Sequence, residues 1–359
     1  MTVQHGALTS EGELYPSPPR ALEYPDVGPP AAGRAITLGP GLLWVRMPLP
    51  MELNHINVWL LADGDGWTLV DTGLSHDASR EAWQGLEPQE LGGRPLRRIV
   101  VTHDHPDHMG LSRWLHERHG APVWMSAVAH RSTGEYLAAA REDLLVANHA
   151  YLTAHGMDIG LDGLRALSGV EHGKWFGGLP PLGRATQGGD SIDVDGRTWE
   201  VIETSGHCRG HLCLYDAGNA VLISGDQVLP TISPNVSVLA SRPEANPLRE
   251  FLDSLARLEQ CAPETLVLPS HGRPFHGLHR RLADVIEHHH QQLAALREFC
   301  IEPRTALDVL PTMFRRVPRG FHRLLAIGEA VAHLNYLCGR GEMERRRDDD
   351  GILRFVTGQ

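Results

Sequence analysis

The stretch Val100-Val101-Thr102-His103-Asp104-His105-Pro106-Asp107-His108 decides the fold. It starts within the short β-branched run Ile99-Val100-Val101, which is typical of a buried strand, and continues directly into three histidines and two aspartates. Polar side chains that follow a buried strand lie at the edge of an α/β sheet, where such sheets usually carry their chemistry. Imidazole and carboxylate are the ligands that borderline divalent ions such as zinc prefer. The stretch therefore predicts a metal site in preference to a solvated loop.

The same arrangement, an apolar run that stops at polar side chains, recurs along the chain. The strand pattern Trp67–Val70 ends at Asp71, and the pattern Ala220–Ser224 is followed by Asp226. Two further runs lead into a glycine- and histidine-rich stretch and into a Ser-His-Gly sequence. The polar residues reached in this way are Asp71, His207, His211, Asp226 and His271. This repetition predicts that the chemistry of the protein is gathered at the ends of strands.

The chain divides into three parts by composition and periodicity. Residues 1–35 are rich in proline, glycine and alanine, and they predict a tail or an arm on the surface. Residues 36–280 alternate strand and helix patterns, as expected for sheets packed with outer helices. Within them, residues 127–180 predict a helical insertion near the site, of two or three helices, which either covers the site as a lid or serves as scaffold.

Residues 281–359 have a different character, with three helical patterns followed by a hairpin pattern. Thr305-Ala306-Leu307-Asp308 resembles a capping box and predicts the start of the second helix. The run His288-His289-His290 is expected on a helix surface, and Arg345-Arg346-Arg347 is expected in a turn neutralised by the aspartates that follow it. Three helices and a two-stranded wing predict a small winged-helix-like domain.

Composition narrows the class of protein. Of the 359 residues, 42% are hydrophobic and 21% are charged, which is ordinary for a soluble globular protein. No apolar run approaches the ~20 residues of a membrane span, and the start of the chain lacks the pattern of a secretory signal. The five cysteines form no CxxC pair, which fits a reducing compartment. We therefore expect a cytoplasmic protein with no membrane partner.

The charge distribution bears on partners. The net charge is −11, but residues 281–359 hold 12 arginines and 11 acidic residues, whereas the preceding 280 residues hold 21 basic and 33 acidic ones. An acidic main domain repels polyanions within a Debye length, although bound metal ions would offset this locally. Nucleic acid is therefore disfavoured as a partner, a small-molecule substrate is favoured, and homo-oligomer formation stays open.

Taken together, the strand-end motifs resemble those of the metallo-β-lactamase superfamily. Asp71, the stretch His103–His108, His207, Asp226 and His271 occur in the order that this family has, and the resemblance covers residues of about 40 to 275. The C-terminal part looks like the winged-helix tail of the β-lactamase-like-protein-2 branch. That resemblance rests on the segment Gly328-Glu329-Ala330-Val331-Ala332-His333-Leu334 and on the hairpin pattern after it.

The resemblance implies an α+β fold, an αββα sandwich, with two divalent metal ions at one edge of the paired sheets. Zinc is favoured, and iron or manganese stays open. The implied ligands are His103, His105 and His207 for the first ion, Asp107, His108 and His271 for the second, and Asp226 as the bridge. The spacing agrees with this division, because side chains two residues apart in an extended segment project the same way.

Other residues near these motifs have implied or candidate roles. A hydroxide bridging the metals would be the nucleophile, and Asp107 would orient it and so act catalytically. Asp71 and His211 are expected to support ligands without ligating. His55 and Asn57 are candidate substrate contacts, with ordinary strand or loop roles as the alternative. Cys208 is expected to serve packing and not as a nucleophile.

These features predict a metal-dependent hydrolase that cleaves an ester, thioester or lactone of a small molecule. A carboxylate at Asp226 resembles the ligand set of glyoxalase II and not that of the cysteine-containing β-lactamases. Only 45 residues separate Asp226 from His271, which excludes the inserted domain of the β-CASP nucleases. Three alternatives remain: a single-strand-specific endoribonuclease, a mononuclear-iron enzyme like the persulfide dioxygenases, and a non-catalytic metal-binding module.

Overall fold

The structure is a computed structural model that describes residues 22–51, 53–167 and 172–358. Most of the predicted N-terminal tail, residues 1–21, lies outside the described residues. From residue 22 onward the arm is tied to the main body: Glu23 forms a backbone bridge with His276, and the Arg273 guanidinium donates to the carbonyls of Pro25 and Val27.

Among the described residues, seven strands form the first sheet and follow one another across it in chain order. They are β1 (Ala35–Gly39), β2 (Leu42–Pro48), β3 (His55–Asp63), β4 (Gly66–Val70), β5 (Leu96–Val100), β6 (Val123–Met125) and β7 (Leu182–Ala185). The pairs from β1 to β4 are antiparallel, whereas β4 to β7 run parallel. Val70 pairs with Val100, so the segments after β4 and β5 emerge at the same edge.

Within the described part of the chain, six strands form the second sheet, in the order β13-β12-β11-β10-β9-β8. They are β8 (Ser191–Val194), β9 (Arg197–Thr204), β10 (His211–Asp216), β11 (Val221–Gly225), β12 (Leu266–Pro269) and β13 (Phe275–His276). The strands β11 and β12 are parallel, and Gly225 pairs with Pro269. The residues that follow both strands therefore also emerge at one edge.

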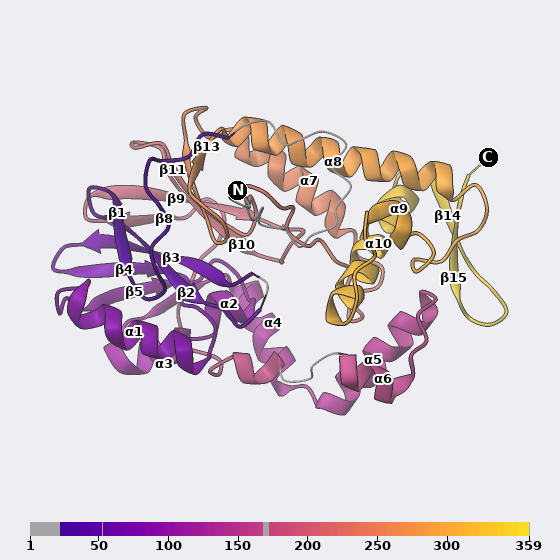
Figure 1. The fold of residues 1–359 in the computed structure, drawn as a ribbon, viewed down its shortest axis with the longest axis horizontal. Helices are drawn as coiled ribbons and strands as arrows, with labels where there is room; N and C mark the ends of the chain where they lie inside the picture. Colours follow the sequence, from indigo (N-terminus) through magenta and orange to yellow (C-terminus); the bar gives the residue numbers. More distant parts are fainter. Residues whose placement is uncertain (1–21, 52, 168–171, 359) are drawn as a thin grey trace, which may run out of the picture.

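The two sheets face each other across a buried layer that includes Trp44, Trp59, Val100, Trp199 and Ile223. On the outer face of the first sheet pack α1 (Asp77–Gln89) and α3 (Ser112–His119), and on that of the second pack α7 (Pro247–Leu258) and α8 (Leu278–Phe299). Figure 1 shows these four layers, helix, sheet, sheet and helix. This arrangement of mixed sheets is consistent with the metallo-β-lactamase fold.

Between residues 106 and 119 the chain forms two helices, α2 (Pro106–Met109) and then α3, separated at Gly110. A Cβ at Gly110 would lie 2.6 Å from the backbone nitrogen of Ser75 and 2.7 Å from the carbonyl oxygen of Trp175. The chain is thus pressed against two other segments at that point, and it turns there. Gly120 ends α3 in the left-handed conformation, which glycine adopts readily.

The segment between β6 and β7 is helical, with α4 (Ala127–Ala138), α5 (Arg141–Ala154), α6 (Gly160–Leu167) and a 3₁₀ turn, η1 (His172–Trp175). Figure 1 shows α5 and α6 below the C-terminal helices and away from the outer helices α1 and α3. The Tyr151 hydroxyl donates to the carbonyl of Val238, and the backbone N–H of Leu307 donates to the carbonyl of His155. The helix α5 therefore contacts both the connection between β11 and α7 and the C-terminal part of the chain.

The C-terminal part contains α8, α9 (Leu310–Met313), α10 (Phe321–Gly339) and a hairpin of β14 (Met343–Arg347) and β15 (Leu353–Thr357). Thr305 and Asp308 form the reciprocal hydrogen bonds of a capping box, but turns follow them instead of a helix. The reason is Pro311, which has no N–H to continue a helix begun at Thr305 and instead stands in the first turn of α9. The order of helices and hairpin agrees with the prediction, and its assignment as a winged helix stays a prediction.

The predicted surface location of His288 and His289 is wrong: the two are 4% and 0% exposed, and only His290 is exposed. The reason is that α8 packs on the second sheet and on α10 at once, so that its buried face is wide.

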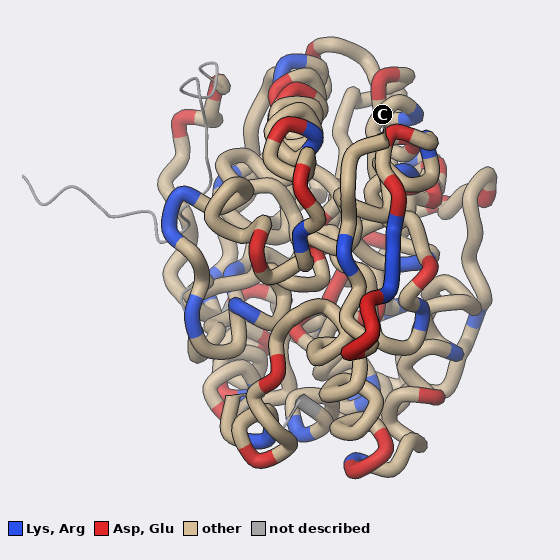
Figure 2. The backbone as a smooth tube through the Cα atoms, turned by 90° about the vertical axis from the view of Figure 1, so that its right-hand side faces the viewer, with Lys and Arg blue, Asp and Glu red and all other residues tan. Residues whose placement is uncertain are grey.

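The arginine-rich hairpin carries acidic residues close to its arginines (Figure 2). Arg345 pairs with Glu244, Arg346 with Glu344, and Arg354 with Asp348. Its positive charge is therefore neutralised, partly by acids outside the predicted aspartate run. Across the described residues, every helix is too short or too polar to cross a membrane.

Candidate metal centre

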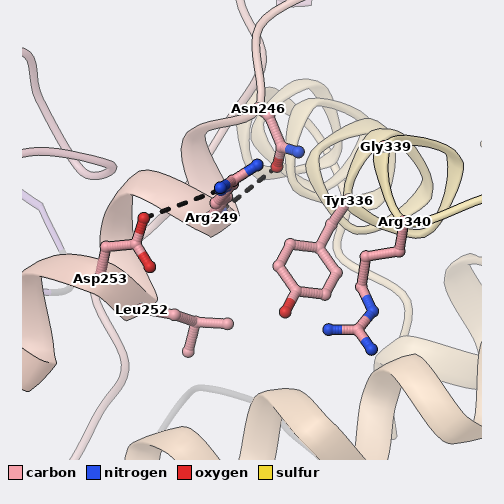
Figure 3. A pocket seen from close by; sticks show the side chains of 7 residues that line it. All are labelled: Asn246, Arg249, Leu252, Asp253, Tyr336, Gly339 and Arg340. Atoms are coloured by element: carbon pink, nitrogen blue, oxygen red, sulfur yellow. Dashed lines mark hydrogen bonds and ion pairs between the residues drawn. The ribbon is translucent and has the colours of Figure 1, made fainter.

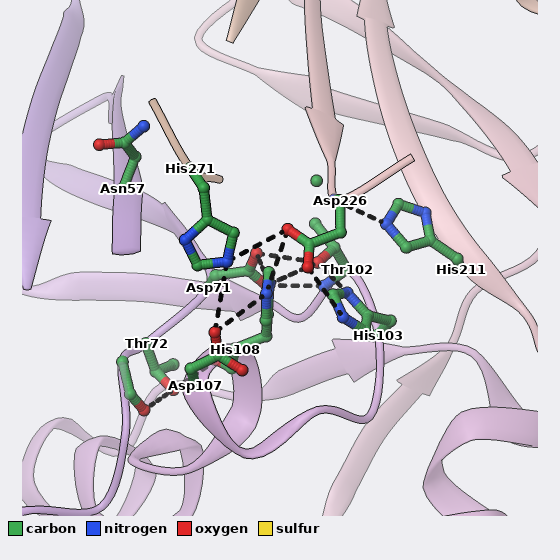
Figure 4. Close-up of polar contacts among 12 residues, drawn as sticks. Asn57, Asp71, Thr72, Thr102, His103, Asp107, His108, His211, Asp226 and His271 are labelled. Atoms are coloured by element: carbon green, nitrogen blue, oxygen red, sulfur yellow. Dashed lines mark hydrogen bonds and ion pairs between the residues drawn. The ribbon is translucent and has the colours of Figure 1, made fainter. Parts of the chain in front are cut away.

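The ends of four strands and one strand connection bring the predicted site residues together (Figure 4). Asp71 follows β4, His103 to His108 follow β5 and enter α2, and His207 lies between β9 and β10. Asp226 and His271 follow β11 and β12 at the same edge. All these side chains are largely buried, with His103 and His108 fully so. The edge where both sheets end their parallel strands is therefore the site.

The donor atoms form three overlapping groups, each with its atoms within 4.8 Å of one another. One group is His103, His105, His207 and Cys208, another is His103, His108 and Asp226, and the third is Asp107, His108 and His271. Asp226 lies between the outer two, because its Oδ2 is 3.4 Å from Nε2 of His207 and its Oδ1 is 3.5 Å from Nε2 of His271. Asp226 is thus the carboxylate that lies between the two outer donor groups.

Several of these donor atoms are buried and unsatisfied. Among the described residues, Nε2 of His103, His108 and His207 and Oδ1 of Asp226 have no hydrogen-bond partner. A buried polar atom without a partner costs about 1–3 kcal/mol, and four such atoms converge on one small volume. Imidazole nitrogens and carboxylate oxygens at these separations suit a divalent cation. The residues present thus fit the metal ions that this fold family binds.

In His108, His207 and His271 the second ring nitrogen, Nδ1, is held by a neighbour. His207 Nδ1 donates to the carbonyl of Asn235 at 2.8 Å, and His271 Nδ1 donates to the carbonyl of His55 at 2.9 Å. The Asp71 carboxylate accepts from His108 Nδ1 at 2.8 Å. Each bond fixes the ring orientation and, in the neutral ring, places the hydrogen on Nδ1, so that Nε2 offers its lone pair to a cation.

Asp71 is one of three described non-glycine residues with positive φ, at +60°. This conformation costs an ordinary residue about 1–2 kcal/mol. It brings the carboxylate onto both Thr102 and His108: the backbone N–H of Thr102 donates to Oδ1 at 2.8 Å, and its hydroxyl contacts both oxygens. Asp71 thus ties the end of β4 to the segment after β5 and orients the His108 ring; its support of a metal ligand stays a prediction.

His211 contacts the cluster from behind. Its Nε2 accepts from the backbone N–H of Asp226 at 3.2 Å, and its Nδ1 lies 3.0 Å from the Thr204 hydroxyl. The ring stacks on His103. Gly225 makes this possible, because a Cβ there would lie 2.5 Å from His211 Nε2. Both ring nitrogens are engaged and His211 contacts the Asp226 backbone, while its exclusion as a metal ligand stays a prediction.

The two candidate substrate contacts do not lie at an open surface. Asn57 is fully buried: its Oδ1 accepts from Trp44 and Arg46, and its Nδ2 donates to the carbonyls of Pro269 and Gly272. A substrate contact for Asn57 is therefore wrong, since every bonding position of its side chain is taken within the protein. Its role is to join β3 to the segment that carries His271.

His55 is partly buried and is engaged with the same segment. Its Nε2 accepts from the backbone N–H of Gly272 at 3.1 Å, and its carbonyl accepts from His271. Burial, followed by the nearby charges of Arg46 and His271, lowers the pKa of His55 to about 3. The ring is thus a neutral acceptor that holds the His271 segment, and its contact with substrate stays a prediction.

The charged groups of the cluster stabilise one another: Asp107 and Asp226 as anions and His108 as a cation. Burial opposes charge on Asp107 and Asp226, but the neighbouring His108 and His271 outweigh it. The pKa of Asp107 falls to about 2, and that of Asp226 lies well below its usual range. Conversely, burial opposes the charge on His108, but Asp226, Asp71 and Asp107 raise its pKa well above the usual range. The carboxylates therefore provide a place for positive charge, which a divalent ion would occupy.

The role of Cys208 is larger than the sequence predicted, and that of Asn235 was not predicted. Cys208 Sγ lies 3.2 Å from His105 Nε2, and burial together with Asp104 raises the pKa of its thiol well above the usual range, so it stays protonated. That Cys208 is no nucleophile stays a prediction, but its contact with His105 gives it a role beyond packing. Asn235 was missed altogether, because it carries no motif and acts through its backbone carbonyl.

A separate cavity of about 320 Å³ lies between α7 and α10 (Figure 3). It is lined by Asn246, Arg249, Leu252, Asp253, Tyr336, Gly339 and Arg340, none of which belongs to the cluster described above. Its two arginines are already engaged, Arg249 with Asp253 at 3.8 Å and Arg340 with Glu342. The cavity therefore adds nothing to the metal centre.

Together, the layered sheets and the histidine–aspartate cluster at their common edge define a metal-binding αββα protein. The chain belongs to the metallo-beta-lactamase superfamily, whose model matches residues 51–271. A second family model, described as metallo-beta-lactamase-like, C-terminal domain, matches residues 293–358. The predicted family is thus confirmed, and a recognised C-terminal domain of this family follows it.

Individual relatives agree with this assignment. A beta-lactamase domain protein from Burkholderia ambifaria has a crystal structure that matches with 41% identity and a TM-score of 0.87, over 94% of this chain and 98% of that one. "Probable metallo-hydrolase YqjP" of Bacillus subtilis (strain 168) is 24% identical over 82% of this chain and 91% of its own length. The acyl-coenzyme A thioesterase MBLAC2 of Gallus gallus is 28% identical over 66% of this chain and 80% of its own length. These relatives support a hydrolase.

Proposed function

We propose that this protein is a dinuclear metal-dependent hydrolase, with zinc as the favoured metal, that cleaves a thioester, ester or lactone of a small molecule. The observation that carries the proposal is the convergence of buried donor atoms without hydrogen-bond partners at the common sheet edge. The similarity to an acyl-coenzyme A thioesterase supports the thioester as the first substrate class to test.

In this proposal each ion has its own protein ligands. His103, His105 and His207 would hold the first ion, Asp107, His108 and His271 would hold the second, and Asp226 would serve both. Ions held there would lower the pKa of a coordinated water and polarise the oxygen of the scissile carbonyl. Because the cluster provides these functions, the proposal needs no serine or cysteine nucleophile, in agreement with the protonated Cys208 thiol.

Asp107 is the residue proposed to act on the attacking water. Its side chain is 20% exposed, against 9% for Asp226, so it is the more accessible of the two carboxylates. Its pKa of about 2 keeps it ionised at neutral pH. An ionised and accessible carboxylate can accept a hydrogen bond from the water and so orient it.

The charge distribution favours a small molecule over nucleic acid. The chain carries a net charge of −11. The arginines Arg345, Arg346 and Arg354 of the C-terminal hairpin are each paired with an acidic side chain. A phosphate backbone would have to displace these pairs, which makes a polyanion the second choice.

The first test measures metal content and thioester turnover on the same preparation. We expect one or two zinc, manganese or iron ions per chain by elemental analysis. We also expect release of free thiol from acyl-coenzyme A or acyl-glutathione substrates, measured beside ester and lactone panels. A protein that is folded yet binds none of these metals would refute the proposal.

A variant pair assigns the activity to the cluster. Asp107→Ala should lower kcat by at least a hundredfold, whereas Asp77→Ala, at an exposed carboxylate on α1, should leave it unchanged. Single-stranded RNA cleavage that disappears in Asp107→Ala would favour the endoribonuclease alternative. A single iron with oxygen consumption on a persulfide substrate would favour the dioxygenase alternative, and full metal occupancy without turnover would favour the non-catalytic module.

A further inference from the structure

The segment of residues 227–246, which joins β11 to α7, follows Asp226 directly and is held mainly by the C-terminal helices. We refer to it as the anchor loop. From α8, the buried guanidinium of Arg281 donates to the carbonyls of Leu229 and Ile232 at 2.6 and 2.7 Å. From α10, Asn335 Nδ2 donates to two carbonyls at the far end of the loop. The anchor loop is thus fastened at both ends.

At its centre, Asn235 connects a proposed metal ligand to α10. Its backbone carbonyl accepts from His207 Nδ1 at 2.8 Å. Its side chain points to the C-terminal helix, where Nδ2 donates to Glu329 Oε2 at 3.1 Å. Its Oδ1 accepts from the Ser237 hydroxyl at 2.6 Å. One residue thus orients the His207 ring through its backbone and is itself fixed through its side chain.

Helix α10 approaches this part of the anchor loop very closely. The backbone N–H of Val238 donates to the carbonyl of Gly328 at 3.0 Å, and the Ser237 hydroxyl also contacts the carbonyl of Leu325 at 3.2 Å. A Cβ at Gly328 would lie 2.9 Å from Ser237. Glycine at position 328 is therefore what allows Glu329, one residue on, to reach Asn235.

The proposed metal chemistry gives the segment Gly328–Leu334 no role, and these contacts provide one for its first two residues. Gly328 and Glu329 both contact the anchor loop beside Asn235, and Glu329 is only 7% exposed. A buried carboxylate that receives a hydrogen bond from the loop is a costly feature for a helix that only completes a core. Its position two hydrogen bonds away from His207 indicates a role in the metal centre.

We infer that Glu329 and Asn235 are positioning residues for His207, and that α10 is thereby part of the metal centre. The inference rests on His207 being a metal ligand, as proposed above. Glu329 fixes the Asn235 side chain, the Asn235 carbonyl fixes the His207 ring with its hydrogen on Nδ1, and Nε2 is left to bind the ion. Outer partners of this kind typically contribute 10–100-fold to metal affinity.

Three α10 variants of the 359-residue chain separate this role from general support of the fold. Glu329→Ala removes the acceptor for Asn235, whereas Glu329→Gln keeps a carbonyl oxygen in its place. Asn335→Ala is the matched control, because it removes two hydrogen bonds between the same helix and the same loop at the end remote from His207. The thermal midpoint of each metal-free variant reports the general loss of support.

The measurement is a titration of each metal-free protein with Co²⁺, followed by the visible absorption of the bound ion. We expect Glu329→Ala to weaken the binding of one ion by about tenfold or more, with Glu329→Gln and Asn335→Ala within about twofold of the wild type. Equal affinity in Glu329→Ala and wild type, or an equal loss in Asn335→Ala, would overturn the inference.

A second substitution covers the case in which Glu329→Ala does not fold. Asn235→Asp keeps the size of the side chain but removes the donor and sets a carboxylate against Glu329, so it should give the same loss of Co²⁺ affinity. Unchanged affinity in this variant would also overturn the inference. Failure of the wild type to bind Co²⁺ would instead refute the proposed metal site, so the two failures are distinguishable.

Discussion

The Asp71 side chain determines which ring nitrogen of His108 carries a hydrogen and which can bind a cation. It is held at φ +60° and accepts from Thr102 and from His108 Nδ1. A carboxylate oxygen accepts hydrogen bonds, so a neutral His108 ring carries its hydrogen on Nδ1 and its lone pair on Nε2. A residue outside the proposed ligand set therefore determines which His108 nitrogen can bind a cation.

This argument predicts the effect of Asp71→Asn. Asparagine tolerates positive φ and has the same size, but its amide can present hydrogens to His108 Nδ1. The His108 hydrogen would then move to Nε2 and oppose the binding of a cation. We expect zinc affinity, measured by competition with a chromogenic chelator, to fall by about 10–100-fold, with a far-UV circular dichroism spectrum like that of the wild type.

The matched control for this substitution is Asp63→Asn. Asp63 is also a buried carboxylate on the first sheet, where it binds Thr68 and Arg98 away from the cluster. It should lower stability while leaving zinc affinity unchanged. If Asp71→Asn bound zinc as tightly as the wild type, the tautomer argument would be wrong.

At the scale of single elements, the sequence predicted the strands well because their ends carry a double signal. Around β5, for example, an apolar β-branched run and a cluster of histidines meet at one boundary, so local pattern and chemistry agree. The positions of Asp71, His103 and Asp226 at one edge followed from the same signal. Those parts of the site are determined by short stretches of local sequence, which is why they could be predicted.

The residues that were predicted wrongly, or not predicted at all, owe their roles to contacts between distant segments of the chain. His288 and His289 are buried because α8 is covered on two sides, which no local pattern reveals. Asn57 was misassigned because its partners Pro269 and Gly272 lie more than 200 residues away. Asn235 acts through a carbonyl that every residue possesses. Tertiary partners, and not local propensity, decided these positions.

The buried histidines of α8 and α10 form a chain of hydrogen bonds with one direction. His333 Nδ1 donates to the carbonyl of Glu329 at 2.9 Å, so its Nε2 accepts from His289 Nδ1 at 3.1 Å. His289 Nε2 is then left to accept from the Ser233 hydroxyl at 3.3 Å. The chain requires both rings to be neutral, because a further proton on either ring would oppose a donor.

This chain predicts acid sensitivity of the helix pair. Burial and the nearby His288 lower the pKa of His333 from 6.5 to about 4, against a weaker opposing effect of its bond to Glu329. Between pH 6.5 and 4 the unfolded state therefore binds a proton that the folded state does not, so stability falls as the pH falls. The loss from His333 reaches about 3 kcal/mol near pH 4.

The measurement is the thermal midpoint of chelated protein between pH 7.5 and 4.5, because chelation removes the contribution of bound metal. We expect His333→Gln to reduce the fall of the midpoint with pH, since glutamine can accept from His289 and does not titrate. His290→Gln, at the exposed neighbour on α8, should keep the slope of the wild type. Identical slopes for His333→Gln and wild type would refute this explanation.

At the scale of the whole molecule, the C-terminal domain and the second sheet share one hydrophobic core. A single cluster of buried residues includes Leu222 of β11, Phe251 of α7, Leu282 of α8, Ile327 of α10 and Phe355 of β15. Together with the anchor loop, this shared core makes the C-terminal elements part of the same folding unit as the sheet. We therefore expect a destabilising substitution in the hairpin to lower the thermal stability of the sandwich as well.

Phe355→Ala tests this expectation with a probe that lies in the sandwich alone. Phe355 is fully buried, and truncating such a side chain costs about 3–5 kcal/mol. All eight tryptophans lie at or before position 199, so their fluorescence reports on the sandwich and not on the hairpin. If the core is cooperative, Phe355→Ala should lower the fluorescence melting temperature by several degrees, together with the circular dichroism transition.

Phe299→Ala, at a side chain of the same domain that is 38% exposed, should change the fluorescence melting temperature little. An unchanged fluorescence transition, with an early separate loss of circular dichroism, would mean that the C-terminal domain unfolds by itself and that its hold on the anchor loop is released before the sheets melt.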